Sequence, residues 1–388
     1  MKPVKILSVD DETDLELLLT QYFRRQIRKG DYQFYFAHNG LEALTMLLRE
    51  KDIDIILSDI NMPEMDGLTL LTKINELQNP ALKCIMVSAY GDMSNIRSAM
   101  NNGAFDFATK PIDLDDLSVT IEKAVEQIDY IQRAQAEHTQ LESLKTDLAV
   151  AGEIQRCILP RIFPPFPEND RELDLAAQMI AAKDVGGDFY DFFRIDKEHL
   201  GLVIADVSGK GIPAAIFMAV SRTLIRTIGM QGYSSAVSIN KSNDLLCDES
   251  VDSMFVTVFY GIYNIATGQV TYTNAGHNPP YLMKADGRIE QLPMSKDLVV
   301  GAIDDFQFSE ETLQLEHGDT LLLYTDGVTE AINSGDEEFG NQRLQAALAQ
   351  LTRENSQEII DRIKASVSDF VGEAEQSDDI TLLAIKRL

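Results

Sequence analysis

The sequence predicts a doubly wound α/β domain over residues 1–122, a helical and coiled-coil linker over 123–158, and an α+β sandwich over 159–388. Three observations predict this order. Apolar strand patterns alternate with helix patterns in the first part. Residues 114–158 contain no proline and a single glycine, which favours one long helix. Runs of strand patterns with inserted helices then follow a proline-rich stretch at 159–167.

Length, charge and cysteine content limit the number of domains, the partners and the cellular compartment that we expect. A chain of 388 residues suggests two or three domains, because single cores stop growing at about 250–300 residues. The net charge of −28 argues against nucleic acid as a partner. Cys84, Cys157 and Cys247 lack a pairing spacing, which fits a reducing cytosol. The amino terminus does not resemble a signal peptide, and no stretch approaches the ~20 apolar residues that span a bilayer. We therefore expect a cytoplasmic protein that does not bind membranes.

The first domain alternates strands and helices. Strands are expected at 4–9, 32–38, 53–58, 84–88 and 105–108, and helices at 15–28, 41–50, 67–77 and 93–101. Five parallel strands with helices on both faces bind ligands outside the carboxyl ends of the strands. The side chains at those ends are Asp10, Asp11, Asp59, Ser88 and Lys110.

These side chains suggest phosphoryl chemistry. Three carboxylates at one sheet edge repel each other, and a hard divalent cation such as Mg²⁺ relieves the repulsion. A carboxylate beside a metal and a lysine can act as a nucleophile toward a phosphoryl group. One acid at a strand end is usually only solvated, whereas the full set with Lys110 is specific.

This set resembles the receiver domains of bacterial two-component response regulators. The resemblance implies that Asp59 is the phosphoacceptor and that a sensor histidine kinase is the donor. It implies that Asp10, Asp11 and Asp59 bind Mg²⁺, with the Asn61 carbonyl in addition. It further implies a phosphate-binding lysine, a switch hydroxyl and a switch aromatic residue, which are Lys110, Ser88 and Phe107.

The linker carries a heptad pattern. Its first apolar residues are spaced alternately four and three positions apart, which predicts a seam that packs against a partner helix. They are Leu117, Ile121, Ala124, Ile128 and Ile131. The seam resumes at Leu141, Leu144, Leu148 and Ala151 after a stammer-like break that holds Gln135 and His138. The pattern predicts a homodimeric coiled coil with a soft middle. An ordinary linker helix packed on its own domains is the alternative.

The third part mixes strands and helices without strict alternation. Strands are expected at 173–182, 200–207, 254–263, 269–274, 280–284, 311–315, 320–325 and 380–386, and helices at 211–228, 235–247, 343–351 and 357–371. Such an order predicts antiparallel sheets packed together with helices outside.

Four acidic turns interrupt these strands, at 185–191, 205–211, 324–327 and 377–381. Each sets Asp beside Gly or at a strand end, and oxygen ligands without His or Cys point to Mg²⁺ or Mn²⁺. Two such ions ~3.5–4 Å apart activate water for attack on a phosphoryl group. Asp326–Gly327 alone is more often a simple turn, and His277 is at least as well explained as a hydrogen-bonded turn residue as a catalytic base.

Together these turns resemble the metal-dependent protein phosphatases of the PPM superfamily, in the bacterial branch typified by SpoIIE and RsbU. The resemblance implies that Asp188 and Asp206, with the Val207 carbonyl, hold one Mn²⁺ or Mg²⁺. Asp206 would bridge to a second ion held with Asp326 and Asp378, and Asp379 is the alternative to Asp378. The arginine that binds substrate phosphate in eukaryotic-type relatives has no counterpart here, and Lys183 is the nearest cation before Asp188. Gly276 and His277 mark this branch without an assigned role.

The order of the three parts resembles the RssB-type response regulators, one branch of which has lost its metal acids and acts as an adaptor. All the acids are present here. We therefore expect a serine/threonine phosphatase controlled by Asp59 phosphorylation, with a phosphorylated STAS-type anti-sigma-factor antagonist as substrate in a partner-switching circuit. The alternative is an adaptor or scaffold that sequesters a signalling partner with little or no activity.

Overall fold

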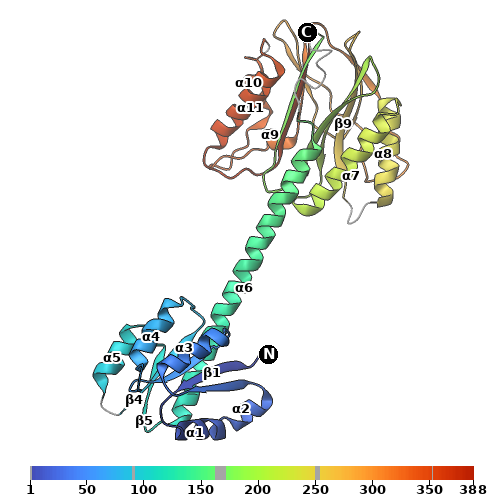
Figure 1. Cartoon of the computed structure of the whole chain (residues 1–388). Helices are drawn as coiled ribbons and strands as arrows, with labels where there is room; N and C mark the ends of the chain where they lie inside the picture. The colour runs from blue at the N-terminus through green and yellow to red at the C-terminus, as the bar shows by residue number, and fades with distance from the viewer. Residues whose placement is uncertain (1, 90–91, 162–171, 250–253, 352) are drawn as a thin grey trace. The chain divides into compact units, whose positions relative to one another are not determined.

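The structure is a computed structural model that describes residues 2–89, 92–161, 172–249, 254–351 and 353–388. The chain divides into two compact units, Met1–Ser143 and Leu144–Leu388. The predicted fold class is confirmed in both units (Figure 1). The predicted domain boundaries at residues 122 and 158 stay predictions.

The first unit contains one parallel sheet in the order β2-β1-β3-β4-β5. Its central strands are nearly continuous apolar runs, because helices cover both faces. Ile6, Leu7, Ile55 and Ile56, for example, are fully buried. The strands are β1 (Val4–Val9), β2 (Tyr32–Ala37), β3 (Ile55–Asp59), β4 (Lys83–Ala89) and β5 (Asp106–Lys110), and the helices are α1 (Asp14–Tyr22), α2 (Arg24–Lys29), α3 (Gly40–Arg49), α4 (Gly67–Glu76) and α5 (Met93–Asn101).

The helix predicted over 15–28 is two helices, with Phe23 at the junction. Phe23 is fully buried, and its ring stacks on Phe34 with a centroid distance of 5.5 Å. The turn between α1 and α2 therefore places this ring in the core. A continuous amphipathic pattern does not reveal such a break, because the apolar positions on both sides keep the helical period.

Helix α6 (Leu114–Ile158) is continuous over 45 residues, through Gln135 and His138. Leu117, Ile121 and Ala124, together with Ile128, pack in the core of the first unit. The expectation that this part of the heptad seam needs a partner helix is therefore wrong. Residues 132–147 are exposed on every side of the helix, and Leu141 and Leu144 are 49% and 51% exposed. The proline-rich stretch at 159–167, which is expected to stop the helix, begins where the helix ends: α6 ends at Ile158, two residues before Pro160, while Pro164, Pro165 and Pro167 lie outside the described residues.

The second unit contains two five-stranded sheets, in the orders β13-β10-β9-β8-β7 and β12-β11-β14-β15-β6. Every strand pair in them is antiparallel. The strands are β6 (Leu173–Ile180), β7 (Phe189–Arg194), β8 (His199–Val207), β9 (Val256–Asn264), β10 (Gln269–Ala275), β11 (Tyr281–Met283), β12 (Ile289–Gln291), β13 (Glu311–Gln314), β14 (Thr320–Tyr324) and β15 (Ile380–Arg387). The helices are α7 (Ile212–Gly229), α8 (Ser235–Glu249), α9 (Asp326–Thr329), α10 (Gly340–Leu348) and α11 (Ser356–Val371).

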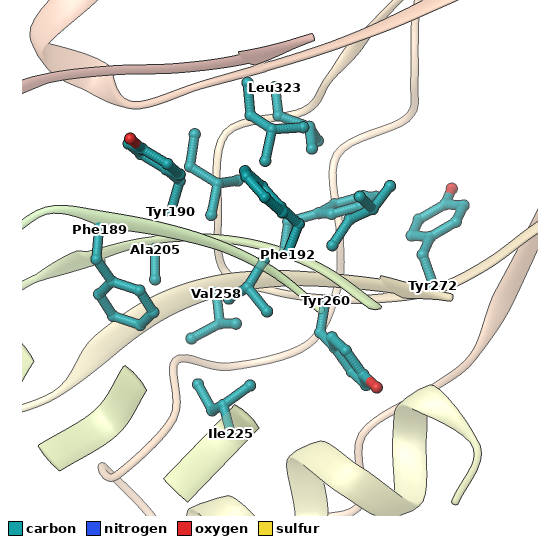
Figure 2. Packing of buried hydrophobic residues seen from close by; sticks show 14 of the residues in the cluster. Phe189, Tyr190, Phe192, Ala205, Ile225, Val258, Tyr260, Tyr272 and Leu323 are labelled. Carbon is teal, nitrogen blue, oxygen red and sulfur yellow. The ribbon is translucent and has the colours of Figure 1, made fainter. Parts of the chain in front are cut away.

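The main core of this unit lies between the two sheets and under α7. Successive residues of a strand face opposite sides of its sheet. Phe192 accordingly points toward Leu323 of the other sheet, whereas Phe189 points toward Ile225 of α7 (Figure 2). A second cluster packs α10 and α11 on the outer face of the other sheet (Figure 1).

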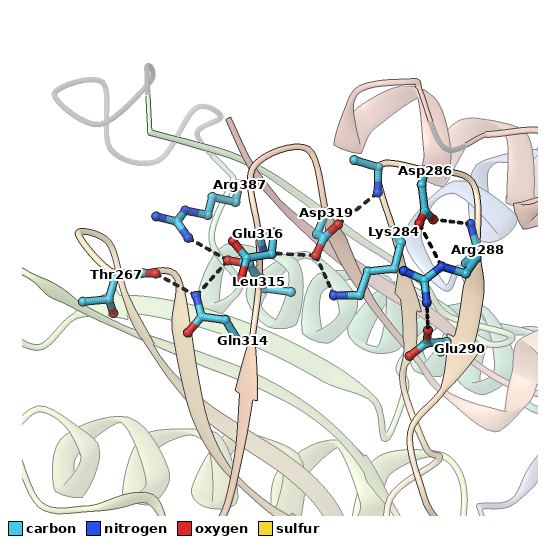
Figure 3. A network of polar contacts seen from close by, with 11 residues as sticks. Thr267, Lys284, Asp286, Arg288, Glu290, Gln314, Leu315, Glu316, Asp319 and Arg387 are labelled. Carbon is cyan, nitrogen blue, oxygen red and sulfur yellow. Dashed lines mark hydrogen bonds and ion pairs between the residues drawn. The ribbon is translucent and has the colours of Figure 1, made fainter.

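A buried carboxylate fixes one end of the sandwich (Figure 3). Asp319, before β14, is 2.9 Å from Lys284 Nζ and accepts a hydrogen bond from the Ala285 amide at 2.9 Å. Nearby, Arg387 Nη1 of β15 donates to the Leu315 carbonyl at 2.8 Å. These contacts hold the turn between β13 and β14 against the second sheet.

Strand β7 was not predicted, because we interpreted Asp188 and Asp191 as parts of one acidic turn. Asp191 is instead buried in the strand, 2.9 Å from Arg222 Nε and 2.8 Å from Arg226 Nη1 of α7. Strand β12 was also missed, and Asp326 begins the short helix α9. Helix α7 has the length and the mean hydropathy, 1.3, of a membrane span, contrary to the sequence expectation, but Ala214 and its other inward-facing residues lie in the domain core.

Candidate functional site

The carboxylates that the sequence singled out gather at two places, one in each unit, and a separate group of exposed acids lies at Asp244, Asp304 and Asp305 of the second unit. In the first unit, Asp10 and Asp11 follow β1 and Asp59 ends β3, which are neighbouring parallel strands. These three residues offer carboxylate oxygens within 4.8 Å of one another, and Asp10 and Asp59 are buried. Burial raises the pKa of Asp10. Carboxylate oxygens at this spacing, two of them on buried residues, fit a hard divalent cation.

The predicted partners of Asp59 lie around it. Lys110 Nζ is 2.7 Å from Asp59 Oδ2 and 2.9 Å from Asp10 Oδ2. Burial alone lowers the pKa of Lys110, but its bonds to these two carboxylates outweigh burial and raise the pKa. Ser88 is buried near the carboxyl end of β4, and its hydroxyl has no hydrogen-bond partner among the described residues. The Phe107 side chain is 36% exposed.

Strand register builds the cluster of the second unit. Phe189 pairs with Ala205, so that the preceding Asp188 comes opposite Asp206 in one sheet. In the other sheet Tyr324 pairs with Leu382, which brings Asp326, after β14, close to Asp378, before β15. The Thr325 hydroxyl donates to Asp188 Oδ2 at 2.6 Å and so joins the two sheets at this end. The four acidic turns therefore meet at one edge of the sandwich.

The charges of this cluster act on one another. Burial, and then the charge of Asp206, raises the pKa of Asp188 well above its usual value. Burial, and then Asp326, raises the pKa of Asp206 to about 7. Burial, and then Asp378, raises the pKa of Asp326. Such mutual repulsion of buried carboxylates is relieved by divalent cations with oxygen ligands, so the donor set fits Mg²⁺ or Mn²⁺.

Asp378 and Asp379 occupy different surroundings. Asp379 is buried, and its oxygens accept hydrogen bonds from the amides of Ala182, at 2.8 Å, and Gly187, at 2.6 Å. Asp378 Oδ2 is instead 2.8 Å from the half-exposed Lys210 Nζ. The Asp379 carboxylate therefore binds the backbone amides of the loop before Asp188, whereas the partner of Asp378 is a flexible lysine at the surface.

The glycines of these turns are required by close contacts rather than by unusual backbone angles. A Cβ on Gly327 would lie 1.9 Å from the Asp379 carbonyl oxygen. A Cβ on Gly186 would lie 2.4 Å from Asp379 Oδ2, and one on Gly187 would lie 3.0 Å from the Val207 carbonyl oxygen. None of the three has a positive φ. Asp326 and Gly327 therefore begin the short helix α9, which packs closely against Asp379, and the assignment of Asp326 as a metal ligand stays a prediction.

His277, after β10, is buried. Its Nδ1 is 2.9 Å from Thr257 Oγ1, its backbone amide donates to Asn274 Oδ1 at 2.8 Å, and its Nε2 has no hydrogen-bond partner in the described part of the chain. Burial lowers its pKa to about 3. These contacts fit the turn-residue interpretation of His277 rather than that of a catalytic base. The preceding Gly276 has a φ of 70°, and a Cβ there would meet Val299 at 2.8 Å.

His277→Gln should flatten the acid side of the stability profile. A group whose pKa falls on folding binds protons better when unfolded, so wild-type stability is lost as pH falls from the unfolded value of about 6.5 toward 3. The slope from this residue approaches ~1.4 kcal/mol per pH unit. Urea unfolding between pH 4 and 7 measures it. A variant with the wild-type slope would contradict the buried neutral state.

Comparisons with known proteins fit both units. Residues 6–122 match the response regulator receiver domain, and residues 196–388 match stage II sporulation protein E (SpoIIE). The phosphoserine phosphatase RsbU of Bacillus subtilis is 32% identical over 251 residues, which cover 63% of this chain and 71% of RsbU. The chain belongs to the SpoIIE family. Its second unit is thus a SpoIIE-type PPM domain, joined to a receiver domain.

Other relatives extend this finding. Protein IcfG of Synechocystis sp. is 31% identical over 270 residues, which cover 63% of this chain but only 42% of IcfG. The SiaA-PP2C domain of Pseudomonas aeruginosa superposes with a TM-score of 0.56 at 21% identity, over 64% of this chain and 98% of that domain. The last likeness shows the fold of the SpoIIE-type domain.

Three residues near the SpoIIE-type cluster were missed in the sequence. Thr325 orients Asp188, Lys210 pairs with Asp378, and Gln155 of α6 contacts the loop before Asp188. Thr325 and Lys210 lie within the acidic motifs themselves, so their proximity was a usable signal. Gln155 lies in the linker sequence, and only the folded chain brings it there.

Proposed function

We propose that this chain is a metal-dependent protein serine/threonine phosphatase controlled by phosphorylation of its receiver domain. The observation that carries the proposal is the cluster of Asp188, Asp206, Asp326 and Asp378 at the edge of a SpoIIE-type fold. Burial, and then a neighbouring carboxylate of the cluster, raises the pKa of Asp188, of Asp206 and of Asp326. RsbU and RsbP of Bacillus subtilis, both similar to this chain, are phosphoserine phosphatases by name.

The residues divide the work as follows. Asp188 and Asp206, with the Val207 carbonyl, would hold one Mn²⁺ or Mg²⁺, and Asp206, Asp326 and Asp378 would hold a second. Bound ions of this kind acidify water for attack at neutral pH and bind a phosphoryl oxygen. Asp378 takes this place rather than Asp379, because backbone amides already use the Asp379 oxygens. The Thr325 hydroxyl holds Asp188 Oδ2 in a fixed direction.

Two lysines beside this cluster bind the substrate phosphate. Lys183, Lys210 and Asp378 line a cleft of about 380 Å³. Lys210 neutralises Asp378 in the structure and becomes available to a phosphate oxygen once another cation pairs with that carboxylate. These two lysines take the place of the arginine that eukaryotic-type relatives use.

The proposal includes a phosphoryl donor, a substrate and an assembly for the two domains. A sensor histidine kinase supplies the phosphoryl group to Asp59, with Mg²⁺ held by Asp10, Asp11 and Asp59. We propose that the substrate is a phosphorylated STAS-type antagonist of an anti-sigma factor. The exposed stretch of α6 with Leu141 and Leu144 pairs two chains into a cytoplasmic homodimer.

Hydrolysis of a phosphoserine peptide by the full chain tests the proposal. After treatment with EDTA and gel filtration, the chain should release phosphate only when Mn²⁺ or Mg²⁺ is restored. Tight binding of phosphorylated antagonist without release of phosphate under either metal would refute the enzyme and support the adaptor.

Asp59→Asn should remove control by the receiver domain. A bistable element between two sites passes a coupling energy of ~1–3 kcal/mol, or about 5–150-fold in rate. Acetyl phosphate should therefore change the wild-type rate by a factor in that range and leave Asp59→Asn unchanged. Asp31→Asn, an exposed acid at the opposite edge of the sheet, is the matched control. Equal responses of wild type and Asp59→Asn would show that Asp59 does not control the phosphatase.

A further inference from the structure

The end of helix α6 is bonded to the loop that carries Asp188. Gln155 is 7% exposed, and its side-chain amide makes two hydrogen bonds to one residue. Nε2 donates to the Gly186 carbonyl at 2.5 Å, and Oε1 accepts from the Gly186 amide at 3.0 Å. Both ends of the amide are used, so the bonds fix the position of Gly186 and also the orientation of its peptide groups.

A second contact lies one turn earlier on the same face of the helix. A Cβ on Gly152 would lie 2.2 Å from the Asp184 carbonyl oxygen. The helix backbone therefore touches the loop directly, and residues three apart on a helix share one face. Gly152 and Gln155 together form a seat for residues 184–186, which we call the loop seat.

The loop is held from its other side by the acidic cluster. Gly186 is packed against Asp379 Oδ2, and the Gly187 amide donates to the same oxygen at 2.6 Å. Asp188 follows directly and has its own bond to Thr325. The backbone from Gly186 to Asp188 is thus clamped between helix α6 and Asp379. Asp188 lies only two residues beyond Gly186, so a displacement of Gly186 moves the backbone that carries the Asp188 carboxylate.

We propose that Gln155 is a positioning residue for the metal site, and that the seating of helix α6 on Gly186 sets how tightly Asp188 binds its ion. This inference rests on the proposed function for its consequence in catalysis, but its core statement concerns metal binding alone. It also gives the linker a direct route to the phosphatase site. A shift of the carboxyl-terminal turns of α6 moves Gly186 through two hydrogen bonds, with no other element between them.

Only a side-chain amide of this length can both donate to the Gly186 carbonyl and accept from the Gly186 amide. Gln155→Met keeps the length and removes both hydrogen bonds, which leaves the Gly186 amide and carbonyl without these partners. Gln155→Asn keeps the chemistry but is one methylene too short to reach. Loss of a residue that orients a metal ligand typically costs 10–100-fold in metal affinity, and Gln155 would orient Asp188 through its two hydrogen bonds to Gly186. Gln140→Met, on an exposed turn of the same helix, is the control.

Mn²⁺ binding measured by electron paramagnetic resonance tests the proposal on the full chain with Asp10→Asn and Asp11→Asn, which disable the receiver site. We expect Gln155→Met to raise the Kd for Mn²⁺ by 10–100-fold, with the wild-type value in Gln140→Met. At saturating Mn²⁺ the kcat should return toward wild type, which a merely structural defect would not allow. If Gln155→Met does not fold, as judged by circular dichroism, Gln155→Asn takes its place.

The outcomes separate this inference from the proposed function. A chain that binds Mn²⁺ but hydrolyses nothing would refute the phosphatase and leave Gln155 to be judged by its Kd. An unchanged Kd in a folded Gln155 variant, or no Mn²⁺ binding by the parent chain, would overturn the positioning role.

Discussion

Asp206→Asn should lower kcat for phosphoserine hydrolysis by about 10³-fold, the upper range for loss of one electrostatic contact to the reacting charge. Asp206 lies opposite Asp188, its pKa is raised by burial and by Asp326, and it is the residue that we assign to both ions. Asp326→Asn should lose a comparable factor. Initial rates with a phosphoserine peptide at saturating Mn²⁺ measure both.

The control for these variants must remove a charge nearby without touching the cluster. Asp184→Asn serves, since this residue lies in the same loop and is exposed. Asp191 is not a suitable control, because it is buried between Arg222 and Arg226. Breaking a buried ion pair lowers the stability of the fold by ~3–5 kcal/mol. If Asp206→Asn retains the rate of Asp184→Asn, Asp206 is not a ligand.

Gly327→Ala should destabilise the SpoIIE-type domain by about 3 kcal/mol, the upper end of the typical cost of overpacking a tight site. The added Cβ would lie 1.9 Å from the Asp379 carbonyl oxygen, a backbone atom that cannot rotate away. For a domain of this size the melting temperature should fall by roughly 10 °C. Differential scanning calorimetry of the metal-free chain measures the shift.

Gly335→Ala is the control for that experiment. Gly335 also has no positive φ, and its Cβ would lie 3.3 Å from the Asn333 side-chain oxygen, which can move. Its melting temperature should stay near that of wild type. Equal melting of Gly327→Ala and wild type would mean that α9 does not approach β15 as closely as described.

The sequence predicted most of the first unit because its signals are local. Apolar runs buried on both faces marked the strands, and the chain order of a doubly wound sheet brought Asp10, Asp59 and Lys110 to one edge. Phe23 was the exception, since the break there serves packing against Phe34 and leaves the helical period intact.

The second unit was harder because its decisive contacts join distant segments. The sequence pattern did not predict strand β7, because its acidic residue Asp191 is buried and forms an ion pair with Arg222 of α7 instead of facing solvent. The first half of the α6 seam indicated a partner helix, but Leu117 and Ile121 pack in the core of their own unit. A heptad pattern shows that a helix has an apolar stripe, but it does not show which element covers that stripe. The different surroundings of Asp378 and Asp379 depend on backbone amides more than 190 residues away in the chain, as in the 192-residue separation from Gly187.

Anomalous scattering from crystals of the full chain soaked in Mn²⁺ would test the metal cluster most directly. We predict two peaks among the carboxylates of Asp188, Asp206, Asp326 and Asp378, about 3.5–4 Å apart, with Asp206 in contact with both. Crystals that show Mn²⁺ at Asp10 and Asp59 but none among these four carboxylates would contradict the phosphatase.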